Sequence, residues 1–468
     1  MSGTLLLSCS PGEVWAALVR DGALAGLRVL RAATGARSGE VLLGRIVALK
    51  PELPAALVDI GLDRPGFLSA EDAAPGAGIA GLHEGQAVIV QVTKEARADK
   101  ATGLTLRPRL EGRHIALTPG REGIAADPGI DPEEARRLTA ALATLARPRE
   151  GFRLRKEAVG VSASGLTEEA EALRRRWQAI EAASRAGKPP LPLEARAAPV
   201  VLALAEFVAA RPDEIVIDDR AALGEARRWL ALQAPALAER VTLYRDALPL
   251  FEERGVAGAI DAALTPRVAL ALGGALTIEE TAAATMIDVD LGSGVGRRGA
   301  AERAALTTNL AAAEEVARQL RLRNLAGPIV IDFIGMRRRE QRERVRAALA
   351  AALDGDAEVL GWTRLGHLEL VRKRRAAPLA SLLYERAPGG GLVKTALTVA
   401  LEALRALARE AARTPPRAAV LRLHPDVAAA LAGPARAARQ ELEQRLGRPI
   451  EVRGEPGRAR EAFDIALN

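Results

Sequence analysis

The sequence TMIDVDLGSGVGRRG, residues 285–299, is compatible with two different kinds of binding site. A short apolar strand carries Asp288 and Asp290 into a glycine-rich loop with two arginines. The loop also matches G-x-G-x-x-G, the dinucleotide-binding fingerprint, at Gly294, Gly296 and Gly299. The pattern therefore leaves two hypotheses, a nucleotide cofactor held by the loop or a metal ion held by the carboxylates.

A helix and a second strand are predicted beyond this loop. Apolar residues recur at spacings of three and four, as on one face of a helix, at Leu306, Leu310, Ala313, Ala317 and Leu320. Gly327 and Pro328 end this helix, and the apolar strand IVIDFIG then carries Asp332. Because a helical crossover brings corresponding ends of two strands together, we expect Asp288 and Asp332 on one edge of a sheet.

The charge of the edge favours the metal hypothesis. A pyrophosphate needs backbone N–H groups and no nearby anions, whereas Asp288, Asp290 and Asp332 repel each other unless a cation joins them. Oxygen ligands without Cys or His indicate Mg²⁺ or Mn²⁺. The alternative, that these acids only cap turns, stays open.

Arginines near the acids are typical of a phosphodiester substrate. They comprise Arg318, Arg321 and Arg323 before Gly327 and the run MRRREQRERVR after Asp332. A solvated helix face is the competing interpretation of such a run.

Composition narrows the class of protein. The 468 residues carry a formal charge of +7 with 49% apolar and 27% charged residues, which is typical of a globular chain of several domains with an anionic partner. Cys9 is the only cysteine, so the chain contains no paired-thiolate zinc site. No stretch approaches the length of a membrane span, and we expect a cytoplasmic protein without membrane contact.

The rest of the chain indicates further domains. Short alternating strands between Gly39 and about residue 110 predict a small barrel, with basic residues crowded near its end (Lys94, Arg97, Lys100, Arg107, Arg109, Arg113). An OB-type barrel that binds single-stranded nucleic acid and a purely structural barrel are both compatible with this pattern. Residues 130–195 are predicted to be helical with a β insert.

Two long motifs carry a resemblance to a known family. IEETAAATMIDVDLGSG and TTNLAAAEEVARQLRLRNLAGPIVIDFIGM resemble the catalytic segment of the ribonuclease E/G family, and the resemblance extends over nearly the whole chain. It implies a multidomain α/β (α+β) fold with a split RNase H-like subdomain, an inserted OB-fold barrel and sensor segment, a DNase I-like catalytic subdomain and a small C-terminal domain. The implied ranges are 1–35 and 200–263 for the RNase H-like parts, 36–118 for the barrel, 119–199 for the 5′-sensor-like segment, 264–378 for the catalytic subdomain, 379–392 for a linker and 393–468 for the small C-terminal α+β domain.

The resemblance also implies roles for individual residues. The family's metal-binding aspartates match Asp288 and Asp332, and Asp290 stands where the family has an asparagine. In the barrel, Phe67 matches an aromatic residue that stacks on RNA, with Leu57 at its partner position, and Lys100 matches a basic RNA contact. Arg155 matches the 5′-monophosphate sensor, whose adjacent threonine is Lys156 here. The family's zinc-linking cysteine motif is replaced by ERAPGGG, residues 385–391.

The sequence thus predicts a Mg²⁺-dependent endoribonuclease that cleaves single-stranded RNA in RNA processing or decay. Asp288, Asp290 and Asp332 would form its catalytic centre, and RNA would contact Phe67, Lys100, Arg155, Lys156 and the three arginines Arg318, Arg321 and Arg323. An RNA-binding relative that has lost catalysis is the alternative, and a nucleotide-dependent oxidoreductase is a third. No zinc is expected, and any oligomer would not be zinc-linked.

Overall fold

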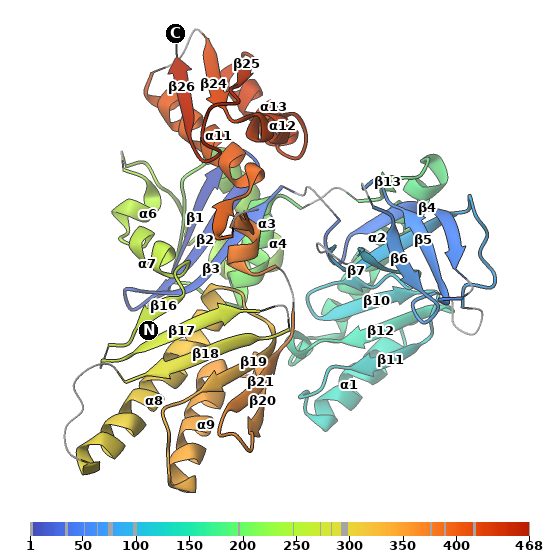
Figure 1. The fold of residues 1–468 in the computed structure, drawn as a ribbon. Coiled ribbons are helices and arrows are strands. Elements are labelled where there is room, and N and C mark those ends of the chain that lie inside the picture. The colour runs from blue at the N-terminus through green and yellow to red at the C-terminus, as the bar shows by residue number, and fades with distance from the viewer. Residues whose placement is uncertain are drawn as a thin grey trace. The chain divides into compact units, whose positions relative to one another are not determined.

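The computed structural model divides into two compact units, one of Met1–Ala32 with Ala198–Asn468 and one of Ala33–Ala197 (Figure 1). No helix among the described residues is long and apolar enough to cross a membrane. The described residues are 3–32, 36–50, 52–62, 64–73, 78–96, 101–194, 197–246, 248–271, 273–281, 283–291, 298–374, 377–387, 390–414 and 418–467.

The first sheet of the larger unit contains strands from both of its chain segments, the one that precedes the smaller unit in sequence and the one that follows it. Its strand order is β15-β14-β1-β2-β3. β1 (Gly3–Ser10), β2 (Glu13–Arg20) and β3 (Ala23–Arg31) form a meander, and β14 (Glu214–Ile217) pairs in parallel with β1. β15 (Val241–Leu243) completes the sheet. Helices α3 (Pro199–Phe207), α4 (Arg220–Gln233) and α5 (Pro235–Ala238) share a core with the sheet, while α6 (Leu250–Glu253) and α7 (Ala257–Ala262) supply residues to a second core.

The central sheet of the larger unit contains the stretch at residues 285–299. Its order is β16-β17-β18-β19-β21-β20, and β18 and β19 are parallel neighbours. The strands are β16 (Arg267–Ala269), β17 (Ala275–Glu280), β18 (Thr285–Asp290), β19 (Gly327–Asp332), β20 (Ala357–Trp362) and β21 (Leu368–Arg372). The helix α8 (Arg298–Leu322) connects β18 to β19, and α9 (Arg339–Leu353) connects β19 to β20. The predicted strand, helix and strand are confirmed.

One face of this sheet packs on α8 and α9. Ala313, Ala317 and Leu320 of the predicted apolar helix face are buried there, with Leu306 and Leu310 partly buried beside them. The strands contribute alternate residues to the same core, because side chains along a strand point to opposite faces in turn. The remaining strand residues point to the other face of the sheet.

The chain continues from this sheet to a small three-stranded sheet. α10 (Leu379–Leu383) and the hairpin of β22 (Tyr384–Arg386) and β23 (Leu392–Lys394) occupy the range predicted to be a linker. Gly390 and Gly391 have positive φ, which lets this hairpin turn. The small sheet has the order β25-β24-β26, formed by β24 (Ala419–Leu423), β25 (Ile450–Gly454) and β26 (Phe463–Leu467), and packs with α11 (Ala396–Arg413), α12 (Pro425–Ala432) and α13 (Arg436–Leu446).

A buried charged network ties α11 to the first sheet. Glu13 accepts hydrogen bonds from Arg31 and Arg405, and Arg31 also donates to the hydroxyl of Thr398 at 3.0 Å. Glu13, Arg31 and Thr398 are all buried, and Arg31 donates to both of the others, so these bonds compensate for the loss of water around the charges of Glu13 and Arg31.

The smaller unit contains a closed barrel and a second sheet. The barrel consists of β4 (Val41–Lys50), β5 (Ala55–Asp59), β6 (Gly66–Ser69), β7 (Ala87–Lys94) and β8 (Gly103–Thr105), and pairing of β4 with β7 closes it. β13 (Leu191–Pro192) adds to β4. The second sheet has β9 (Leu110–Glu111), β10 (Ile115–Pro119), β11 (Gly123–Ala126) and β12 (Glu150–Leu154), with α1 (Pro132–Ala143) and α2 (Ala163–Ala186) against it.

The predicted barrel is confirmed, and its last strand ends at Thr105, within the stretch up to about residue 110 from which the barrel was predicted. Residues 110–119 form the β9–β10 hairpin, and β10 pairs with β12. Leu110, Ile115 and Leu117 are buried in the core under α1 and α2, which is why these residues belong to the second sheet.

Candidate active site

Three aspartates lie on the face of the central sheet that α8 and α9 leave uncovered. In β18, Ile287 and Val289 are buried whereas Asp288 and Asp290 are exposed, and Asp332 ends β19 in the same exposed orientation. Asp288 and Asp332 are register partners on the two parallel strands. The expectation that they share one edge of a sheet is confirmed.

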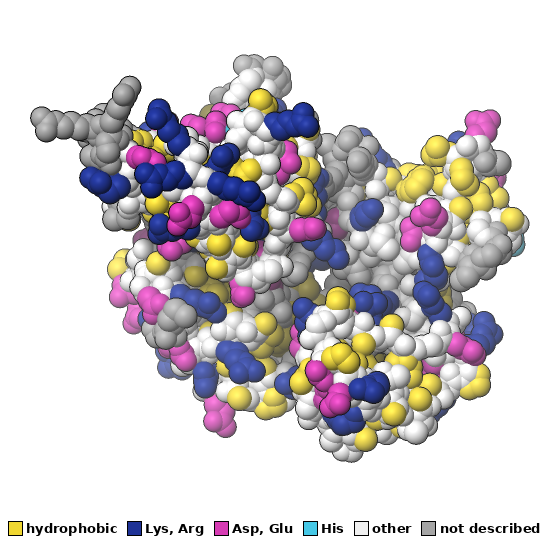
Figure 2. All heavy atoms as spheres, turned by 90° about the horizontal axis from the view of Figure 1, so that it is seen from below, with side chains coloured by type: hydrophobic (Ala, Val, Ile, Leu, Met, Phe, Trp, Pro, Cys, Tyr) yellow, Lys and Arg dark blue, Asp and Glu magenta, His cyan; other side chains and the backbone are white. Residues whose placement is uncertain are grey.

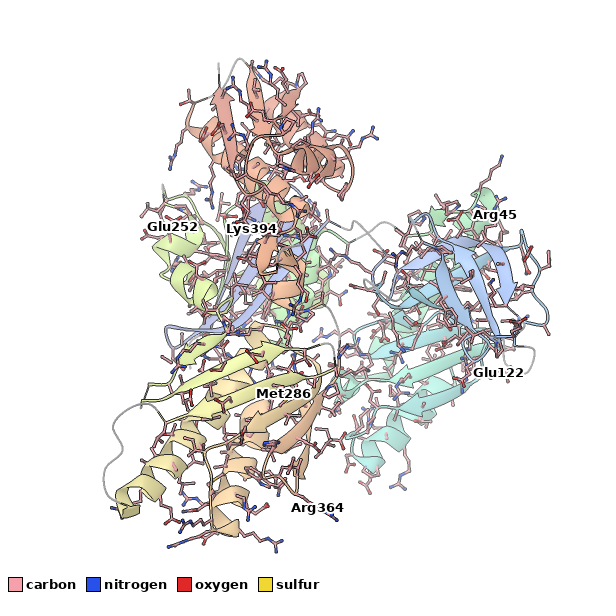
Figure 3. All side chains as sticks on the ribbon, viewed as in Figure 1. Arg45, Glu122, Glu252, Met286, Arg364 and Lys394 are labelled. Carbon is pink, nitrogen blue, oxygen red and sulfur yellow. The ribbon has the colours of Figure 1, made fainter. Side chains whose placement is uncertain are left out.

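Neighbouring strands extend this acidic centre. Thr277 of β17 is the register partner of Asp288. Arg267 of β16 places Nη1 3.6 Å from Oδ2 of Asp290. Figure 3 labels Met286, which is exposed in β18 on the same face, and Arg364 in the turn between β20 and β21. The centre therefore lies on an open sheet face that a long, flexible polymer can reach.

The electrostatics of the centre fit a bound cation. Partial burial raises the pKa of the Asp288 carboxyl, and the negative charges of Asp290 and Asp332 raise it further. A cation between these carboxylates would relieve that repulsion, and carboxylate oxygens are the ligands that Mg²⁺ prefers. As the side chains stand, no group of three His, Cys, Asp or Glu residues in the described ranges is placed to hold an ion together. Mg²⁺ commonly takes one or two carboxylates and fills its shell with water and substrate phosphate, so the Asp288–Asp332 pair suits it.

Asn309 is a site residue that the sequence analysis missed. It is fully buried in α8, its side-chain amide donates to the carbonyl of Ile334 at 2.8 Å, and its side-chain oxygen accepts from the Ile334 N–H at 3.1 Å. Ile334 lies just beyond Asp332, so this pair of bonds fixes the backbone that follows the carboxylate. The only sequence signal was an amide between apolar helix positions.

Arg318 and Arg321 in the last turns of α8, and Arg323 directly after the helix, make contacts inside the protein. Arg318 pairs with Glu315 and donates to the carbonyl of Leu24, and Arg321 donates to the carbonyl of Ala352. Arg323 is buried and donates to Gln319 and to the carbonyl of Thr265. RNA contact by these three side chains would have to replace or share these bonds.

The basic run after Asp332 leads into α9 and is largely exposed. Figure 2 shows Lys and Arg side chains gathered over the end of the larger unit where α8 and α9 begin, with Asp and Glu side chains among them. Arg338, for example, lies 3.5 Å from Glu302. The glycine-rich loop with Gly294 and Gly296, which raised the dinucleotide hypothesis, lies outside the described residues, and of Gly299 only the backbone is described.

The predicted RNA-binding residues of the smaller unit fall in two places. Phe67 is half-buried on the barrel surface, with Leu57 and Gly103 as its register partners. Arg155 follows β12, donates to the carbonyl of Gly112, and lies 3.8 Å from Glu111 and 3.6 Å from Glu157. Lys156 is exposed beside it. Lys100 lies outside the described residues.

Fold and site together define a multidomain α/β protein with an acidic centre on an open sheet face. A profile described as the ribonuclease E/G family matches residues 109–375. Ribonuclease G of Haemophilus influenzae is 32% identical over 99% of both chains, and Ribonuclease G of Escherichia coli K12 is 31% identical over 100% of both. Ribonuclease E of E. coli K12 is 32% identical over 88% of this chain and 41% of its own. The chain belongs to the ribonuclease E/G family.

Proposed function

We propose that this protein is a divalent-cation-dependent endoribonuclease that cleaves single-stranded RNA. The observation that carries the proposal is the alignment of Asp288 with Asp332 across β18 and β19, in a chain whose relatives are ribonucleases by name. The exposure of both carboxylates on an uncovered sheet face supports a substrate as large as RNA.

In this proposal Asp288 and Asp332 hold Mg²⁺ or Mn²⁺. A bound ion would supply Lewis-acid chemistry for phosphodiester hydrolysis, in which a water oxygen forms a bond to phosphorus, one P–O bond to a ribose breaks and the leaving oxygen takes up a proton. Asp290, on the same face of β18 as Asp288, would accept a hydrogen bond from the attacking water and so orient it. Arg267 lies beside Asp290 and balances the added negative charge at a position where the family usually has an uncharged amide.

We assign candidate RNA contacts to each of the two units separately. The partly exposed ring of Phe67 offers a stacking surface for a base, and Leu57 beside it offers apolar contact without stacking. Lys100 and the basic run before α9 would bind phosphates, as would Arg155 and Lys156 at the end of the second sheet. Arg318, Arg321 and Arg323 remain weaker candidates, because their guanidinium groups already have partners within the protein.

The finer subdomain names are also part of this proposal. We assign 1–35 with 200–263 as a split RNase H-like subdomain, 36–118 as an OB-fold barrel, 119–199 as a sensor-like segment, 264–378 as a DNase I-like subdomain and 393–468 as a small C-terminal domain. The parallel pairing of β1 with β14, and the closed five-stranded barrel between them in sequence, support the split and the insertion. With Cys9 as the only cysteine, any oligomer would be held without a cysteine-bound zinc. We expect the enzyme to act in the cytoplasm.

A circular single-stranded RNA tests the proposed activity. A circle has no ends, so only an endonuclease converts it to linear product. We expect Mg²⁺-dependent linearisation by the full chain and none in excess EDTA. Tight binding of the circle with no cutting in Mg²⁺ or Mn²⁺ would instead establish the alternative, an RNA-binding relative that has lost catalysis.

A further inference from the structure

His367 continues the row of residues that contains the two aspartates. Thr277, Asp288 and Asp332 are register partners across β17, β18 and β19. β21 runs antiparallel to β19 with Ile331 opposite Leu368, and beyond this pair Asp332 at the end of β19 lies beside His367, which directly precedes β21. The sheet therefore brings a histidine from the β20–β21 turn to the end of an acidic row.

The turn holds the imidazole beside the carboxylate. The backbone N–H of Thr363 donates to the carbonyl of His367 at 2.8 Å, and the His367 N–H donates to the Thr363 hydroxyl at 3.1 Å. Trp362 at the start of the turn packs against Phe333, which directly follows Asp332, with ring centroids 5.9 Å apart. The contact between Trp362 and Phe333 thus holds the β20–β21 turn against the end of β19.

The Nε2 atom of His367 lies near Asp332 and has no hydrogen-bond partner among the described residues. Its Nε2 lies 3.7 Å from Oδ2 of Asp332, too far for a hydrogen bond. Among the residues that the structure describes, neither ring nitrogen makes a hydrogen bond, and the side chain is 29% exposed. Two ligands of one ion at about 2.1 Å lie roughly 3 Å apart, so a small side-chain rotation would bring Nε2 into the same shell as Asp332.

We propose that His367 supplies a nitrogen ligand to the divalent cation bound by Asp288 and Asp332, and that this ligand favours Mn²⁺ over Mg²⁺. The inference rests on the proposed cation site and adds to it. Imidazole nitrogen binds the divalent first-row transition metals, a series that begins with Mn²⁺, whereas Mg²⁺ prefers oxygen ligands. A site with two carboxylates and one imidazole therefore gains more affinity for Mn²⁺ than for Mg²⁺.

Electron spin-echo spectroscopy of the Mn²⁺-loaded full chain tests this directly, because a coordinated imidazole couples ¹⁴N to the electron spin. We expect this coupling in the parent protein and in His83→Leu, a control at an exposed histidine of the barrel unit. We expect its loss in His367→Leu and in His367→Gln, which retains polarity and similar size. Mn²⁺ affinity should fall about tenfold in both His367 variants, and Mg²⁺ affinity by clearly less.

Two results would overturn the inference in distinguishable ways. Stoichiometric Mn²⁺ binding that Asp332→Asn weakens, but without ¹⁴N coupling or any loss in the His367 variants, refutes the role of His367 and leaves the carboxylate site intact. No Mn²⁺ binding by the parent protein, or binding that Asp332→Asn does not weaken, refutes the cation site itself and His367 with it. Circular dichroism melting of each variant shows that the comparison is made on folded protein.

Discussion

Asp288 and Asp332 lie 44 positions apart in sequence and directly opposite each other in the structure, as register partners on β18 and β19. Parallel neighbours direct paired side chains to the same face, and here that face is the one without helices. The intervening α8 therefore does two things: it provides the crossover that makes the strands parallel, and it covers the opposite face with apolar residues.

Asn309 is predicted to be needed for the position of Asp332. Asn309→Ala leaves the N–H and carbonyl of Ile334 without their buried partners, which should lower the free energy of unfolding by about 2 kcal/mol. The segment after Asp332 would move, so Mn²⁺ affinity should fall as well. Thr307→Ala, at an exposed position of the same helix, is the control and should change neither. Wild-type metal affinity in a folded Asn309→Ala protein would contradict this role.

Asp218 should make stability depend on pH. Burial raises the pKa of its carboxyl from 3.8 to about 6, although the Cys9 N–H and the Ser8 hydroxyl donate to it. The folded state then binds this proton more tightly than the unfolded state. The contribution of Asp218 to the free energy of unfolding is therefore fully present below about pH 3.8 and is lost as the pH rises through about 6. The total change in the free energy of unfolding is on the order of 1–3 kcal/mol.

Asp218→Asn should remove this dependence, because the amide carries no titrating proton. Urea denaturation at a series of pH values measures it: the stability of the variant relative to the parent should rise between about pH 4 and 6. Two parallel stability profiles would show that Asp218 does not titrate in this range.

Phe67 is predicted to contribute stacking energy to RNA binding. Phe67→Ala should weaken binding of a single-stranded oligonucleotide by about 1–3 kcal/mol, and Leu57→Ala by less, because an aliphatic side chain cannot stack on a base. The salt dependence of binding should be the same in both variants, because neither the Phe67 nor the Leu57 side chain carries a charge. Fluorescence anisotropy at several salt concentrations measures both quantities, and equal losses in the two variants would argue against stacking.

Discrimination of a 5′-monophosphate should be weak. Reading a terminal phosphate requires several donors that converge on one point, but Arg155 already donates to Gly112 and lies near Glu111 and Glu157. Lys156 adds a flexible charge where the family has a short hydroxyl donor. Cleavage rates of 5′-phosphorylated and 5′-hydroxyl forms of one RNA should differ by less than about tenfold. A larger preference that Arg155→Ala abolishes would show a working sensor.

Sequence patterns predicted the elements whose signals are local. The apolar spacing from Leu306 to Leu320 defined α8, and the strand–helix–strand order placed Asp288 beside Asp332. The barrel strands were predicted up to about residue 110, whereas the sheet to which Ile115 and Leu117 belong, under α1 and α2, was not predicted. Local pattern does not say which sheet a short strand joins.

Residues that act through long-range contacts were not predictable in the same way. No histidine was included in the predicted site, because the position of His367 beside Asp332 depends on the antiparallel register of β19 and β21. The apparent linker at 379–392 forms α10 and a hairpin, since α10 packs its leucines into a core shared with the first sheet. Arg323 was expected to face RNA, and its burial follows from packing beside Thr265.

The central claim is that the aspartate pair binds a cation that cleavage requires. The most direct measurement compares cleavage and binding of one single-stranded RNA by the parent protein and by Asp332→Asn, with Mg²⁺ and with EDTA. We predict that the variant cuts at least about a hundredfold more slowly, that EDTA abolishes cutting by the parent, and that RNA affinity stays within about threefold, because the barrel contacts remain. Undiminished cutting by Asp332→Asn, or full activity of the parent in EDTA, would contradict the account.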